Sequence, residues 1–91
     1  MIAILPTIVE FLGSFVFLSV IVATGNPWVI GATLAVLIYL GVDVSGGHYN
    51  PAVTLMTLYN KDITLSTAAM YVIAQVAGGI LAVITYNLLK R

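Results

Sequence analysis

Three long apolar stretches separated by short polar breaks dominate the hydrophobic pattern of the chain. The stretches at about residues 2–24, 28–44 and 66–89 each contain roughly the 17–25 residues with which an α-helix crosses a bilayer. A fourth segment, about residues 45–59, opens with polar residues and glycines, and its helical part is too short to cross at about 1.5 Å per residue. The pattern predicts an all-α membrane protein with three transmembrane helices and one re-entrant half-helix.

The polar breaks carry residues that begin helices. Gly25-Asn26-Pro27 is a compact turn signal, which predicts that the first two spans are adjacent and antiparallel. Pro51 suits the first position of a helix, because it has no N–H to pair, and Asn50 is then the natural N-cap. The polar run at residues 59–62 must return to water, so we expect the re-entrant segment to leave on the side where it entered.

The irregular backbone at residues 45–49 predicts a pathway. Such backbone is tolerated at membrane depth only where protein buries it or water lines it, because each unpaired N–H or C=O in hydrocarbon costs several kcal/mol. A half-helix also directs the positive end of its dipole toward the membrane interior, an arrangement that channels and transporters use. The segment is therefore typical of a pore lining.

Composition agrees with the membrane assignment, with 62% hydrophobic and 7% charged residues and a mean hydropathy of +1.16. A net charge of zero gives no basic surface for nucleic acid, and the absence of cysteine excludes disulfides and thiolate metal sites. His48, the single histidine, has no neighbouring ligands at metal-binding spacing, and Ser45 has no base and acid partners. We therefore predict no enzyme activity, no metal and no cofactor.

Three motifs resemble those of a known family. Ser45 to Val53, SGGHYNPAV, closely resembles the first Asn-Pro-Ala signature of the aquaporin and glycerol-facilitator (major intrinsic protein) family. Glu10 to Phe15 resembles that family's first-helix motif, and Tyr71 to Gly79 resembles its third helix. Family members carry two such repeats of opposite membrane orientation in one polypeptide. The resemblance implies that residues 1–91 form a single aquaporin-like repeat, similar to the N-terminal one.

The resemblance also implies which residues border the pore. His48 would orient the loop and border the pore, and the Asn50 amide would donate at the constriction. Counting back from Asn50 puts the filter position of the second span on or near Ile30, and a slip of one residue would place Val29 or Gly31 there instead. We expect an apolar, uncharged constriction. The complete pore-lining set is Gly46, Gly47, His48, Tyr49, Asn50, Pro51, Ala52 and Ile30.

Glu10 needs a partner, because a carboxylate within a span is costly and normally faces a bundle interior or a cavity. It could brace the loop by accepting hydrogen bonds from its N–H groups, or it could be an interfacial glutamate near a helix end. Its match to the family's first-helix motif favours bracing. In the last span, Ala74, Gly78 and Ala82 form a row of small residues that predicts close helix packing.

We expect a multi-pass channel in the lipid bilayer that passes water or small neutral solutes such as glycerol. Two copies would pair in antiparallel orientation, or a separate complementary repeat would pair with this one. Lys61 on one side and Lys90-Arg91 on the other give only a weak orientation bias, which permits dual insertion. The alternatives are a non-conducting structural membrane protein and a fragment of a longer gene.

Overall fold

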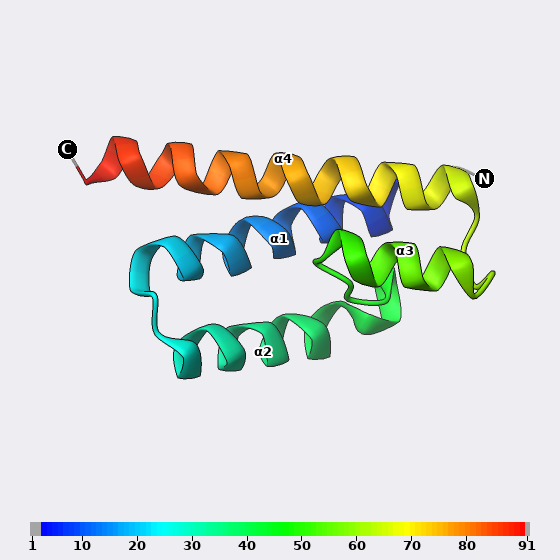
Figure 1. Cartoon of the computed structure of the whole chain (residues 1–91), viewed down its shortest axis with the longest axis horizontal. Helices are drawn as coiled ribbons and strands as arrows, with labels where there is room; N and C mark the ends of the chain where they lie inside the picture. Colours follow the sequence, from blue (N-terminus) through cyan, green and yellow to red (C-terminus); the bar gives the residue numbers. More distant parts are fainter. Residues whose placement is uncertain (1–2, 91) are drawn as a thin grey trace.

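A computed structural model of the protein describes residues 3–90, which form four helices and no strand. The helices are α1 (Ile4–Thr24), α2 (Pro27–Ser45), α3 (Pro51–Tyr59) and α4 (Leu65–Leu89) (Figure 1). The described chain confirms the all-α prediction of three long helices and one short one. Residue 2, where the first predicted span begins, lies outside the described residues. The observed helices end at residues 24, 59 and 89, as expected, and the bounds expected at residues 28, 44 and 66 each differ by one residue.

The helix ends follow from local side chains and glycines. Asn26, Asn50 and Thr64 are the N-caps of α2, α3 and α4, and each side chain accepts a hydrogen bond from a backbone N–H of the first turn. Gly25 and Gly46 follow α1 and α2 in the left-handed conformation, with φ of 58° and 92°. The chain therefore turns sharply after each of the first two helices.

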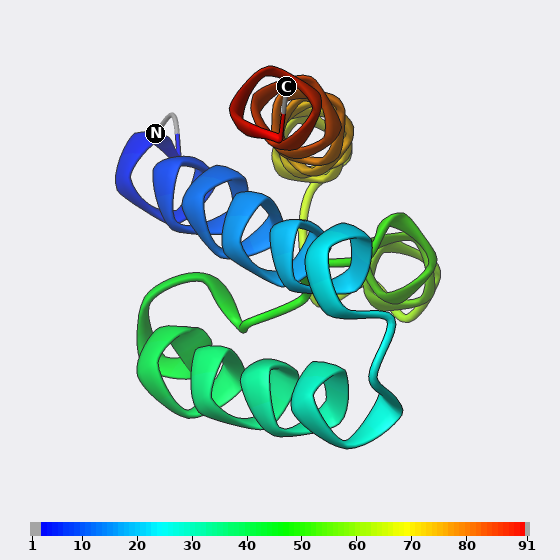
Figure 2. The ribbon, with the colours of Figure 1, turned by 90° about the vertical axis from the view of Figure 1, so that its left-hand side faces the viewer.

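Helix α1 is the centre of the bundle. It packs against α4 on one side and against α2 on the other, while α3 packs against α4. Figure 2 shows α2 and α4 on opposite sides of α1, with the segment between α2 and α3 passing back along the inside of α2. Helices α1, α2 and α4 have 21, 19 and 25 residues and are apolar enough to cross a membrane.

The interface between α1 and α4 is built from small residues. Ala74, Gly78 and Ala82 are all buried on α4. A Cβ added at Gly78 would lie only 2.7 Å from the Phe11 carbonyl oxygen, which belongs to the backbone of α1. The two helices therefore approach so closely that residue 78 has room for a hydrogen atom alone.

Polar residues occupy the deepest positions of this small bundle. The largest fully buried side chains are those of Glu10, Thr54 and Ser14, and Gln75 is 4% exposed. Large apolar side chains lie mostly on the outside, where a bilayer would cover them. The interior of the repeat is therefore a polar cluster within an apolar shell.

We predict that Gly78→Ala destabilises the bundle relative to Gly79→Ala. Both substitutions gain helix propensity, but the Cβ at Gly78 meets main-chain atoms, while that at Gly79 lies 3.4 Å from Leu18 Cδ1 in ordinary contact. Overpacking of this kind costs about 1–3 kcal/mol. Thermal unfolding in detergent micelles measures the difference, and equal melting temperatures for the two variants would contradict this account of the interface.

Candidate functional site

The Glu10 carboxylate lies at the centre of the polar cluster and is 0% exposed. Its Oε1 accepts hydrogen bonds from the Tyr49 N–H at 2.7 Å and from Gln75 Nε2 at 2.9 Å. Its Oε2 accepts from the His48 N–H at 3.0 Å and from Ser45 Oγ at 2.7 Å. Four donors thus surround one carboxylate, which compensates for the loss of its hydration.

The loop owes its shape to three left-handed residues. Gly46, Gly47 and Tyr49 have φ of 92°, 61° and 52°. This backbone turns the N–H groups of residues 48 and 49 toward Glu10. Within residues 3–90, the carbonyl oxygens of Gly46, Gly47 and His48 accept no hydrogen bond. The loop therefore satisfies its donors on the protein side and leaves acceptors free.

A second layer of contacts fixes the His48 ring. Thr54, which is 0% exposed, has its Oγ1 2.8 Å from Gln75 Nε2 and 2.9 Å from His48 Nδ1. Gln75 and His48 therefore share the Thr54 hydroxyl, which links the ring to α4. The ring also packs edge-on against Tyr71, with centroids 5.2 Å apart.

Tyr71 adds a further brace to the loop, because its hydroxyl donates to the Ser45 carbonyl at 2.7 Å. This bond satisfies the last carbonyl of α2, where the helix ends and the loop begins. Residues of α1, α3 and α4 therefore all hold the loop.

The Asn-Pro-Ala segment lies at the start of α3. Asn50 is exposed, and its Oδ1 accepts from the Ala52 N–H at 2.8 Å. Its Nδ2 donates no hydrogen bond within the described chain. Pro51 is half-buried and Ala52 is exposed. The amide of Asn50 thus caps the half-helix with its oxygen and presents its nitrogen as a free donor.

The remaining predicted pore residues are placed differently. Tyr49 is 4% exposed and its hydroxyl donates to the Leu37 carbonyl of α2 at 2.8 Å, so this hydroxyl is already paired with the protein. Ile30 is half-buried on α2 and belongs to none of the contacts around Glu10. The structure brings Glu10 and residues 45–49 together.

This arrangement, a glycine-bearing loop held by a buried carboxylate before a short helix, can be compared with known proteins. The family described as Major intrinsic protein matches residues 22–91. The chain belongs to the major intrinsic protein family. With its three apolar helices, this family member is an integral membrane protein.

Curated relatives agree with the family assignment. The chain is 36% identical over 105 residues to a protein named probable aquaporin PIP2-7 from Oryza sativa subsp. japonica, covering 92% of this chain and 36% of the relative. It is 43% identical over 82 residues to glycerol uptake facilitator protein-like 6 from Lactiplantibacillus plantarum, covering 80% of this chain and 38% of the relative. This major intrinsic protein chain spans about a third of the length of such relatives. No solved structure matches it.

Sequence reasoning missed three residues that hold the loop of this family member, namely Thr54, Gln75 and Tyr71. Gln75 carries a usable signal, because an amide within an apolar span needs a hydrogen-bonding partner. Thr54 and Tyr71 carry little signal, since hydroxyl-bearing side chains occur in many membrane helices and often pair with their own helix backbone.

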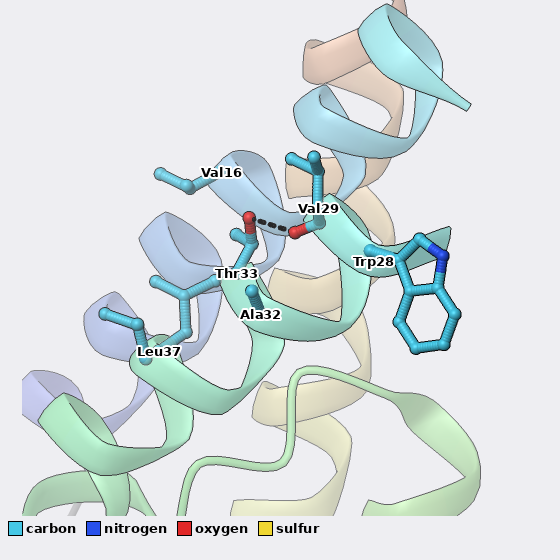
Figure 3. A pocket seen from close by; sticks show the side chains of 7 residues that line it. Val16, Trp28, Val29, Ala32, Thr33 and Leu37 are labelled. Atoms are coloured by element: carbon cyan, nitrogen blue, oxygen red, sulfur yellow. Dashed lines mark hydrogen bonds between the residues drawn. The ribbon is translucent and has the colours of Figure 1, made fainter. Parts of the chain in front are cut away.

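An apolar groove runs between α1 and α2 on the outside of the repeat. One part, of about 520 Å³, is lined by side chains of both helices and includes the 83% exposed Trp28 (Figure 3). The hydroxyl of Thr33 donates to the Val29 carbonyl at 2.7 Å, so it offers no unpaired proton there. The groove continues past Val16 and Leu37 into a second hollow of about 270 Å³ beside Tyr49.

We predict that Glu10→Gln loosens the loop. The glutamine amide offers one oxygen to the four donors and turns its NH₂ group toward two of them. Each lost hydrogen bond to the carboxylate is expected to cost about 1.5–3 kcal/mol, the usual contribution of a hydrogen bond to a charged group. Hydrogen exchange at the amides of residues 48 and 49 should become faster and the melting temperature should fall. Asp43→Asn, at an exposed position of α2, is the matched control. Unchanged exchange in Glu10→Gln would show that the carboxylate does not hold the loop.

Proposed function

We propose that this chain is one repeat of a membrane channel for passive transport of water and small neutral solutes such as glycerol. A second copy of opposite membrane orientation completes the pore. The observation that carries the proposal is the polarity of the loop, which directs N–H groups to Glu10 and leaves the carbonyls of residues 46–48 and the Asn50 Nδ2 unpaired. Relatives named as aquaporins and as a glycerol uptake facilitator support the same class of function.

The free groups match the needs of a neutral, hydrogen-bonding solute. Such a solute leaves water by exchanging its hydrogen bonds for those of the three carbonyl acceptors, and then accepts from the Asn50 amide at the start of α3. A hydrated cation gains less, because the half-helix directs the positive end of its dipole toward the same point. The passage involves no covalent chemistry.

Pairing follows from the cost of exposing these groups. Asn50 and Gly46 are exposed in the single repeat, and unpaired polar backbone facing hydrocarbon costs several kcal/mol per group. A second, inverted copy would cover this face and bring a second half-helix to the same level. The charged residues permit inversion, because Lys61 lies in the turn after α3 and Lys90 lies at the far end of α4.

We predict that vesicles containing the purified protein swell or shrink in response to osmotic gradients, and that Asn50→Asp lowers this flux. The aspartate keeps the oxygen that caps α3 but loses the Nδ2 donor and adds a negative charge. Stopped-flow light scattering measures the flux, and thermal melting should show that the variant remains folded. Equal flux in both proteins and in empty vesicles would support a non-conducting structural protein instead.

Reporter fusions at both termini provide the control for assembly. Two orientations in equal amounts are expected for an antiparallel pair of identical copies. A single uniform orientation would exclude this pair and require a different chain to supply the second repeat.

We predict that Ile30→Trp reduces glycerol flux more than water flux. If Ile30 lines the constriction, the larger indole narrows an apolar, uncharged filter, and the bulkier solute is affected first. Val29→Trp is the matched control, because Val29 lines the outer groove instead. Equal losses for both solutes, or none, would mean that the filter lies elsewhere.

A further inference from the structure

Tyr49 holds a backbone conformation that is rarely adopted by a residue with a large side chain. Its φ of 52° lies in the left-handed region, where non-glycine residues are uncommon. The N–H of Tyr49 donates to Glu10 Oε1 at 2.7 Å, which holds the residue in this conformation. The direction of the side chain is therefore determined by the same carboxylate that holds the loop.

The Tyr49 ring fills a slot made by two glycines on different helices. A Cβ added at Gly13 of α1 would lie 2.7 Å from the ring Cζ, and one at Gly41 of α2 would meet the hydroxyl group. The hydroxyl donates to the Leu37 carbonyl at 2.8 Å, so it is satisfied although the residue is 4% exposed. Without the ring, α1 and α2 would have an opening at this level.

Hollows lie on both sides of this ring. The outer one, of about 270 Å³, lies between α1 and α2 and joins the groove of Figure 3. The other, of about 300 Å³, is called the inner hollow because Pro51 of the half-helix and Gln75 of the polar cluster border it. Apolar residues of α1 and α4, among them Leu18 and the exposed Ile80, complete its lining. Tyr49 is the one residue common to both linings. Its side chain is thus a partition between an apolar groove and the neighbourhood of the Asn-Pro-Ala segment.

We propose that the Tyr49 side chain seals the wall of the pathway between α1 and α2, so that water beside Pro51 does not reach the outer apolar groove. This inference rests on the proposed function, because it assumes that the inner hollow is wet. The seal depends on size, since Gly13 and Gly41 leave space for a ring and the ring occupies it. Tyr49 is therefore a sealing and positioning residue, separate from the groups that bind solute.

Single cysteines test the seal directly, because the chain contains none of its own. Leu12→Cys places a thiol in the outer hollow, and Ile80→Cys places one in the inner hollow. Each is made with Tyr49 intact, with Tyr49→Phe, which keeps the ring, and with Tyr49→Gly, which removes the ring and suits the left-handed backbone. A charged methanethiosulfonate reagent is then added to vesicles containing the protein.

With Tyr49 or Tyr49→Phe, we expect Ile80→Cys to react and Leu12→Cys to react slowly. With Tyr49→Gly, the Leu12→Cys rate should rise by about tenfold or more, because water admits the reagent and favours the reactive thiolate. Trp28→Cys, at the exposed end of the groove, should react in every background and shows that the reagent is active.

An unchanged Leu12→Cys rate in folded Tyr49→Gly, while Ile80→Cys reacts, would overturn the seal and leave the proposed function standing. Failure of Ile80→Cys to react in any background would overturn the proposed function and the seal with it. If Tyr49→Gly does not fold, Tyr49→Leu shortens the side chain and should give an intermediate Leu12→Cys rate. A rate equal to that with Tyr49 would again contradict the seal.

Discussion

The repeat depends on one buried carboxylate that cannot remain unpaired. Glu10 lies on the central helix and accepts hydrogen bonds from the end of α2, from the loop and from α4. Removing an ionised group from water is costly unless several donors replace its hydration, so these four contacts act together. The irregular loop follows from this requirement, because residues 48 and 49 must both turn their N–H groups in the same direction. These donors are then committed to Glu10, while the carbonyls of residues 46–48 accept no hydrogen bond within the described chain.

Sequence reasoning predicted the fold class because its signals are strong and local. Span length, proline at the start of α2 and α3, and glycine after α1 each act within a few residues, and the all-helical architecture is confirmed. The need of Glu10 for a partner also followed from its position in an apolar span. The sequence did not identify all four donors to Glu10, because a carboxylate accepts equally well from any N–H or O–H that packing brings near.

The contacts around His48 and Tyr49 illustrate what the sequence could not supply. The pattern Ser45 to Val53 carries a family resemblance, but it does not say that Tyr49 turns its ring between Gly13 and Gly41. That placement depends on the separation of two helices, which no local pattern encodes. The bond from Gln75 to Thr54, whose hydroxyl also contacts His48, likewise depends on the way that α3 packs against α4. The roles of Tyr49 and Thr54 therefore follow from the packing of the helices, which the motif does not specify.

The order of synthesis gives the Glu10 contacts a consequence for membrane insertion. Helix α1 is made first, yet the donors to its carboxylate come from residues that are translated 35, 38, 39 and 65 positions later. During that interval the carboxylate must keep water or another donor, since it has no partner of its own within α1. The first helix therefore cannot reach its final state in lipid as an independent unit. All four donors are present only when Gln75 of α4 has been made, so the carboxylate gains its full set of partners only with the last helix of the repeat.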